Sequence, residues 1–143
     1  MDNRIAKITI IGKPTGKGRP KFSRQGNFIR TYTPEKTVNY ENLVKMAWYN
    51  EGLEKMEGKI TATIFAYFKI PKAVSKKKRA QMDGAFYDKK PDTDNLAKSI
   101  LDALNGIAYD DDSQVVSLLV SKKYTDGEEK AVLILEEVGD ATV

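Results

Sequence analysis

The chain has 143 residues, 41% hydrophobic and 31% charged, with a formal net charge of +4 at pH 7. It contains no cysteine and no histidine, which excludes disulfides, thiolate zinc sites and catalytic triads built on histidine. Any bound metal must therefore have oxygen ligands, which favours Mg²⁺ or Mn²⁺. The length predicts one domain over 1–143. With no long apolar run or signal-peptide pattern, we expect a cytoplasmic protein without membrane contact.

The first third of the chain predicts strands separated by a loop, followed by a helix. β-branched residues at 7–12 predict an opening strand, and the glycines and prolines of 13–27 predict a loop. A short strand is expected at 28–32. A helix over 34–51 follows, because Pro34 suits the first position of a helix.

The middle of the chain begins with the clearest strand, at 59–70, whose apolar residues alternate along its length. A short basic helix is predicted at 74–81, with Ser75 as its cap. A third helix starts at Thr93 or Asp94 and ends at the Asn-Gly pair of 105–106.

The end of the chain predicts two strands. The segment 114–124 is apolar on both faces at its start, which predicts a strand in the interior of a sheet. Asp126-Gly127 is typical of a hairpin turn, and 130–138 is predicted to return as the last strand. The whole pattern predicts an α+β (mixed α/β) fold, with a mixed sheet of four to five strands and two main helices.

Asp92 and Asp94 stand where the third helix begins. In a helix, residues two apart point about 200° apart, but in extended backbone they lie on one side with Cα atoms about 6.6 Å apart. Pro91 favours extended backbone just before them, so the two carboxylates can converge on one cation. A helix cap is the alternative explanation, and the spacing alone leaves both open.

Along the same helix, Asp94, Lys98 and Asp102 form one polar stripe, opposite a predicted buried face. Asp102 lies about 12 Å along the axis from Asp94, too far to share its ion, so we assign it a supporting or structural role. Lys98 is a candidate catalytic cation, with a surface ion pair to Asp94 as the alternative. The buried face consists of Leu96, Ala97, Ile100, Ala103 and Leu104.

A third ligand is expected from the acidic run 109–114, and Asp112 is the candidate, with a solvated turn as the alternative. The helix is about 20 Å long, and the connection 106–112 spans about 23 Å at most. Asp112 therefore reaches the start of the helix in the same subunit along a nearly straight path, or a dimer partner supplies one component.

Other acidic sites fit less well. An EF-hand fails because Leu96 and Ala97 stand where a further ligand and a glycine are required. An aspartate-nucleophile phosphatase would need an apolar strand directly before Asp92. A Mn²⁺-dependent Asp-x-Asp transferase stays open on chemistry, although it leaves the basic residues of 13–36 unexplained.

The motifs Lys90-Pro91-Asp92-Thr93-Asp94-Asn95-Leu96-Ala97-Lys98, Asp102-Ala103-Leu104-Asn105-Gly106 and Asp111-Asp112-Ser113-Gln114-Val115 closely resemble the RusA family of Holliday junction resolvases. "GKPTGKGRPKF" and "YTPEKT" resemble its phage and prophage members. The resemblance implies a homodimeric, Mg²⁺-dependent endonuclease of four-way DNA junctions, without an organic cofactor. Asp92, Asp94 and Asp112 match the family's metal ligands, and Lys98 matches its essential lysine. Asp111 matches the family's other acid, for which we expect a supporting catalytic role.

A polyanionic substrate also accounts for the charge distribution, since residues 13–36 contain seven bases and one acid, Glu35. For Phe22 and Phe28, packing in the core is favoured over wedging against unstacked bases. A non-catalytic, structure-selective DNA-binding protein is the rival function. The candidate phosphate contacts are Lys17, Arg19, Lys21, Arg24, Arg30, Lys89 and Lys90.

Overall fold

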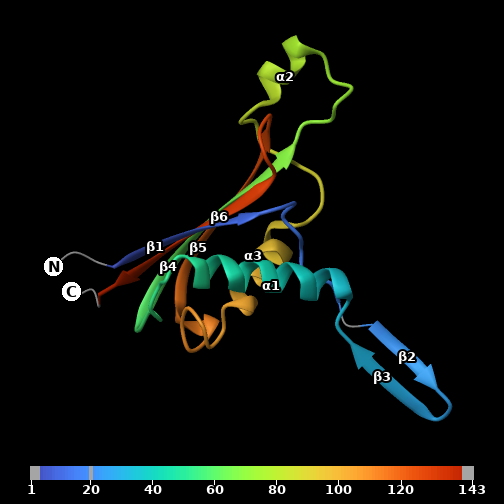
Figure 1. The fold of residues 1–143 in the computed structure, drawn as a ribbon, viewed down its shortest axis with the longest axis vertical. Coiled ribbons are helices and arrows are strands. Elements are labelled where there is room, and N and C mark those ends of the chain that lie inside the picture. The colour runs from blue at the N-terminus through green and yellow to red at the C-terminus, as the bar shows by residue number, and fades with distance from the viewer. Residues whose placement is uncertain (1–3, 20, 140–143) are drawn as a thin grey trace.

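The computed structural model describes residues 4–19 and 21–139, and two helices cover one face of a four-stranded mixed sheet (Figure 1). The sheet order is β1-β6-β4-β5, and β4 runs parallel to β5 and antiparallel to β6. The predicted α+β class is confirmed. The elements are β1 (Ile5–Ile11), β2 (Lys21–Gln25), β3 (Phe28–Tyr32), α1 (Glu35–Asn50), β4 (Lys59–Lys69), α2 (Lys76–Met82), α3 (Thr93–Ala103), the 3-10 helix η1 (Asp112–Gln114), β5 (Val115–Thr125) and β6 (Lys130–Val138).

Alternating apolar residues build the core beneath the helices. The predicted inward face of β4 is buried along its length, and β1 and β6 alternate in the same way. Val44 and Trp48 of α1 pack against this face together with α3. The sheet and both helices share one hydrophobic core, and each large side chain removed from water contributes about 1.5–3 kcal/mol.

α3 buries the predicted face, which anchors the helix that carries Asp94. Leu96, Ile100 and Leu104 are fully buried, and so is the polar Ser99, whose hydroxyl is hydrogen-bonded. The helix ends at Ala103, three residues before the predicted end. The turn that follows contains Gly106 at a φ of 76°, a conformation that glycine adopts without strain.

Two predictions about β5 are wrong. The strand lies at the edge of the sheet, and not in its interior, because β6 pairs with β1 and β4. The turn at Asp126-Gly127 therefore carries the chain across the end of β4, so the predicted hairpin is wrong. The second half of the outer edge is partly covered, since backbone of 84–87 bonds to that of 122–124. The first half exposes large apolar side chains, namely Val116, Leu118 and Leu119.

β2 and β3 form a separate two-stranded ribbon that projects from the body of the protein (Figure 1). The prediction for β3 is confirmed, but the predicted loop 13–27 contains β2 in its second half. The favoured core position of Phe22 and Phe28 is wrong, because they are 74% and 80% exposed. A strand without a buried face has no alternating pattern to reveal it.

The helix boundaries otherwise follow the sequence closely. α1 starts at Glu35, with Pro34 at its N-cap position, one residue later than predicted. The Ser75 hydroxyl caps α2 by accepting a hydrogen bond from the Lys78 amide, as predicted. In residues 4–19 and 21–139, no helix combines the length and the apolar character that crossing a membrane requires.

Candidate functional site

Asp92 occupies the N-cap position of α3 but does not cap it. Its backbone is extended, with φ −65° and ψ 152°, and the helix begins at Thr93 as predicted. The whole first turn is described, and the Asp92 carboxylate accepts no hydrogen bond from its amides. The carboxylate instead lies 3.0 Å from the Lys90 ammonium. Asp92 and the neighbouring Asp94 are both exposed, so two carboxylates face solvent at the start of α3.

Lys122 of β5 holds the backbone that leads into Asp92. Its ammonium donates hydrogen bonds to the carbonyls of Lys89 and Pro91, at 2.7 and 2.8 Å. The Lys90–Pro91 peptide bond is cis. The ring of Tyr87 lies 5.6 Å from the Lys122 ammonium, and the Tyr87 hydroxyl donates to the Lys90 carbonyl at 3.3 Å. This contact of Lys122 could not be predicted from the sequence, because a lysine late in a strand carries no local signal of it.

Two hydrogen bonds join the glycine-rich loop that follows β1 to α3. The Lys17 amide donates to the Asn95 carbonyl at 3.1 Å, and the Ser99 hydroxyl donates to the Thr15 carbonyl at 2.6 Å. Ser99 was not predicted as a functional residue. A polar residue on the buried face of α3 was the sequence signal that its hydroxyl needs a hydrogen-bond partner. These hydrogen bonds fix the position of the loop relative to the helix that carries Asp94.

A cavity of about 430 Å³ lies between this loop, the start of α1 and the segment before α3. Gly16 borders it, and a Cβ atom at that position would lie 2.9 Å from the Cβ of Pro91. The close approach requires glycine for steric reasons. The cavity is lined by Lys13, Pro14, Thr15, Gly16, Lys17, Gly18, Pro34, Lys36, Thr37, Lys90, Pro91, Asp92 and Asn95.

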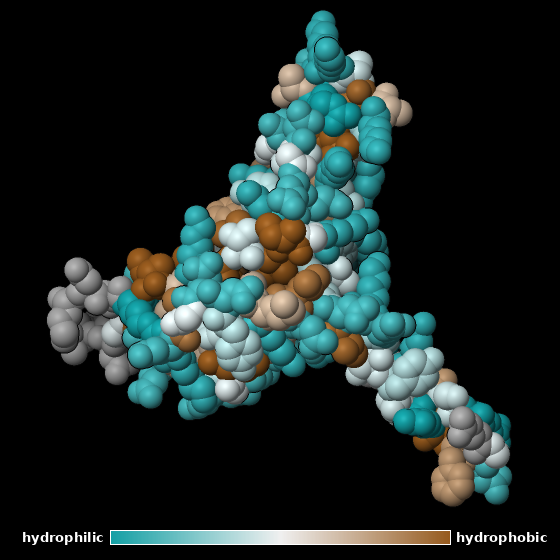
Figure 2. All heavy atoms as spheres, in the orientation of Figure 1, coloured by the Kyte–Doolittle hydropathy of each residue, from teal (hydrophilic) through white to brown (hydrophobic). Residues whose placement is uncertain are grey.

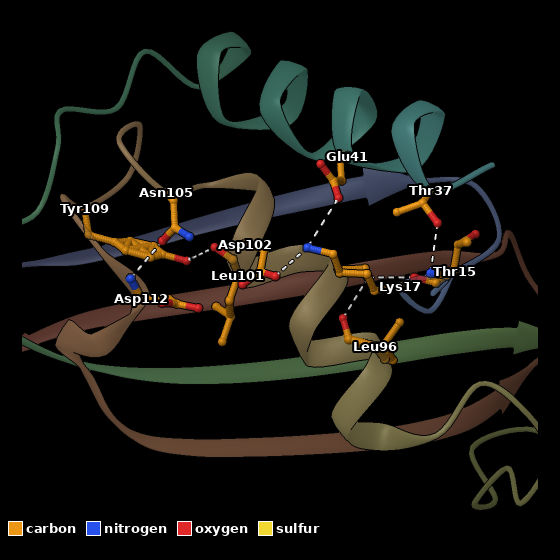
Figure 3. Close-up of polar contacts among 12 residues, drawn as sticks. Thr15, Lys17, Thr37, Glu41, Leu96, Leu101, Asp102, Asn105, Tyr109 and Asp112 are labelled. Atoms are coloured by element: carbon orange, nitrogen blue, oxygen red, sulfur yellow. Dashed lines mark hydrogen bonds and ion pairs between the residues drawn. The ribbon is translucent and has the colours of Figure 1, made fainter. Parts of the chain in front are cut away.

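At the other end of α3, Asp102 joins a second polar cluster (Figure 3). The Lys17 ammonium lies 2.6 Å from the Asp102 carboxylate and 4.0 Å from that of Glu41. Asp112 lies beside Asp102, and its amide donates to the Asn105 side chain at 2.8 Å. The hydrogen bond to Asp102, partial burial and neighbouring negative charge raise the pKa of Asp112. Asp102 therefore contacts Asp112, a contact that the sequence did not predict.

The two remaining acids of the run 109–114 have structural contacts. Asp111 caps η1, since its carboxylate accepts a hydrogen bond from the Ser113 amide at 2.9 Å. This bonding lowers the pKa of Asp111. Asp110 is ion-paired with Lys55 at 2.6 Å. The supporting catalytic role considered for Asp111 thus competes with an observed capping role.

One chain does not bring Asp112 to Asp92 and Asp94. The connection after α3 turns back on itself instead of running straight, because the Gly106 amide bonds to the Tyr109 carbonyl at 2.8 Å. Buried Tyr109 also donates its hydroxyl to the Leu101 carbonyl. Over the described residues, no three acidic, histidine or cysteine side chains are placed to hold a metal ion. The straight path within one subunit is therefore not taken.

The predicted phosphate contacts divide into two groups. Lys17 is ion-paired with Asp102, and Lys90 is ion-paired with Asp92. Lys89 donates a hydrogen bond to the Tyr124 hydroxyl at 3.1 Å, which raises the pKa of Lys89. The side chains of Arg19, Lys21, Arg24 and Arg30 are exposed to solvent, and so are those of Lys89 and Lys90.

Lys98 is also exposed, and it lines a hollow of about 370 Å³ with Lys17, Gly18, Arg19 and Asn95. A further hollow of about 380 Å³ joins Asp94 to the exposed part of β5. Its lining residues are Thr93, Asp94, Leu118, Leu119 and Val120.

Comparison with known proteins identifies the family. The family described as Endodeoxyribonuclease RusA matches residues 12–134. The protein described as uncharacterized protein YqaN, from Bacillus subtilis (strain 168), is 34% identical over 135 residues, which cover 91% of this chain and 95% of the relative. The match begins just after β1 and includes the ribbon, both main helices and the acidic run. The chain belongs to the RusA endodeoxyribonuclease family.

Proposed function

We propose that this protein is a Mg²⁺-dependent endodeoxyribonuclease that resolves Holliday junctions and related branched DNA during recombination and repair. The observation that carries the proposal is the uncapped carboxylate of Asp92 at the start of α3. A carboxylate that served the helix would accept its first amides. In a member of an endodeoxyribonuclease family, the exposed pair of Asp92 and Asp94 is suited to a metal ion instead.

The residues present fit such an ion in part. Oxygen ligands suit Mg²⁺, with Mn²⁺ as the alternative, and Asp92 and Asp94 supply two of them. A third carboxylate is missing at this end of α3 in a single chain, as far as residues 4–19 and 21–139 are concerned. We therefore assign the third position to Asp112 of a second subunit, which makes the functional unit a homodimer.

The exposed first half of β5 suits that dimer. An unpaired apolar strand edge is a template for pairing with another chain, and a two-fold axis makes two copies of one strand antiparallel. Antiparallel pairing centred on Val116 would pair the partner's Val115 with Ser117 and bring the partner's η1, which carries Asp112, beside residues 118–120 of β5. Val120 and Asp94 line the same hollow, so this register would complete a site in each subunit.

The chain's own groups supply the rest of the chemistry. A bound Mg²⁺ would provide activation of the attacking water and stabilisation of the leaving oxygen. Lys98, exposed one turn after Asp94, would offset the negative charge that develops on the scissile phosphate. Arg19 and the arginines of the ribbon would hold flanking phosphates, which makes binding strongly salt-dependent. No histidine is needed for this route.

The test is a cleavage assay on four-way junction, flap and duplex DNA with Mg²⁺, with EDTA as control. Asp94→Asn and Asp112→Asn should each abolish cleavage while junction binding persists. Mixed together, the two variants should recover activity, because a mixed dimer places both substitutions in one site and leaves the other intact. Half of the dimers are then mixed, so roughly a quarter of the wild-type sites are intact.

The matched control is a mixture of Asp92→Asn and Asp94→Asn. Both residues belong to the same half of the site, so every mixed dimer keeps a defect in each site and should stay inactive. Absence of recovery in the Asp94/Asp112 mixture would exclude the shared site. Retained cleavage by Asp94→Asn would exclude the metal assignment, and binding without cleavage by wild type would favour a non-catalytic DNA-binding protein.

A further inference from the structure

Among the side chains that the structure describes, none of the β2–β3 ribbon is buried against the rest of the protein. In its register Phe22 pairs with Thr31, and Arg24 pairs with Ile29, the residue after Phe28. Side chains of paired residues share a face, so Phe22 and Phe28 lie on opposite faces. They are 74% and 80% exposed, and Ile29, on the face of Phe22, is exposed as well. A ribbon that served only the fold would bury one of its faces.

The charge of the ribbon and its flanks has one sign. Residues 12–34 contain six lysines and arginines and no acid. Arg24 lies on the face of Phe22, and Arg30 lies on the face of Phe28. Each face therefore combines an exposed aromatic ring with an arginine. Figure 2 shows hydrophobic and hydrophilic atoms interspersed over the projecting ribbon.

This combination is suited to DNA at a branch point. A second copy of the ribbon would repel the first through like charge, whereas phosphates would attract it. A two-stranded ribbon fits the major groove of a duplex, which is about 12 Å wide. Aromatic rings bind bases by stacking when a face of the base is open, and base stacking is interrupted where duplex arms meet.

We propose that the β2–β3 ribbon is the element that selects branched over linear DNA, with Phe22 and Phe28 stacking on bases at the branch point and Arg24 and Arg30 binding adjacent phosphates. This inference rests on the proposed function, because it assumes DNA as the substrate.

The attachment of the ribbon connects it to the candidate metal site. Before β2, the Lys17 amide bonds to the Asn95 carbonyl of α3, and the Gly18 amide donates to the Thr37 hydroxyl at 2.9 Å. After β3, the chain enters α1 directly at Glu35. A ribbon seated at the branch point thereby fixes where the DNA strands pass the start of α3.

The test compares binding of a four-way junction and a matched duplex, by fluorescence anisotropy in EDTA. Loss of one base–aromatic stack weakens binding by about tenfold, so Phe22→Ala/Phe28→Ala should lose about 10- to 100-fold on the junction and less than about twofold on the duplex. Arg24→Ala should weaken both about equally. Phe86→Ala is the matched control, because Phe86 is 77% exposed but lies on the segment after α2, and it should leave both unchanged.

A second readout addresses stacking directly. With 2-aminopurine at the branch point, wild type should change its fluorescence on binding, and the double phenylalanine variant should not. An unchanged junction-to-duplex ratio in that variant would overturn the inference, as would a lower sedimentation coefficient, which would make the ribbon an assembly contact. Junction-selective binding by a wild type that never cleaves would overturn the proposed function and leave this inference standing.

Discussion

Replacing Asp112 by asparagine should stabilise the metal-free protein at neutral pH while abolishing cleavage. Hydrogen bonding to Asp102, partial burial and charge repulsion raise the pKa of Asp112. Two unit charges 4 Å apart interact by about 4 kcal/mol at an effective dielectric constant near 20. Because solvent reaches Asp112 and Lys17 lies 2.6 Å from Asp102, we expect about 1 kcal/mol to remain, or about 3 °C in melting temperature.

The raised pKa of Asp112 determines how the stability gained in Asp112→Asn should change with pH. The folded pKa of Asp112 is raised, so the destabilisation is complete above that pKa and vanishes below the usual value of 3.8. The gain in Asp112→Asn should therefore shrink as the pH falls from about 7.5 to about 3.5.

The assay is thermal unfolding in EDTA, followed by circular dichroism over that pH range. Asp110→Asn is the matched control, because Asp110 is exposed and pairs with Lys55 instead of another carboxylate; it should give no gain. An Asp112→Asn protein less stable than wild type at about pH 7.5, or a gain that persists at about pH 3.5, would refute the repulsion.

Two further substitutions test how the start of α3 is held. Lys122→Met removes both hydrogen bonds to the preceding backbone and should lower cleavage about 100-fold with junction binding nearly unchanged; Lys123→Met is the control, and equal losses in both would contradict the assignment. Gly16→Ala should lower cleavage about tenfold, because its Cβ would meet Pro91 at 2.9 Å. Gly127→Ala, with its nearest neighbour at 3.5 Å, should have little effect, and wild-type turnover by Gly16→Ala would contradict the close-packing argument.

Elements with one buried face could be predicted from the sequence. The alternation of β4 and the buried stripe of α3 follow directly from burial on one side. The position of β5 in the sheet could not be predicted. A strand that is apolar on both faces predicts an interior position, whether the chain itself or a second subunit covers it. β2 was missed for the opposite reason, because neither face of the ribbon is buried.

The sequence supplied the candidate site residues but not how they are arranged in space. The extended Asp92 and the helix start at Thr93 follow from local backbone preferences, which a short motif encodes. The separation of Asp112 from Asp94 depends on how the chain turns after α3, and the length of the connection set only an upper limit. The hydrogen bonds of Lys122 depend on tertiary packing, which leaves no trace in a single sequence.

Lys122 also has a consequence for how the nuclease would be controlled. It projects from β5, the strand whose exposed half is proposed to join two subunits, and it grips the backbone next to Asp92. A change in the order of β5 would therefore change how firmly the Asp92 carboxylate is positioned. A lone subunit, even at a high local concentration of DNA, would hold its acidic pair less firmly and lack the third ligand. At concentrations where the monomer predominates, cutting would then depend on the square of the protein concentration.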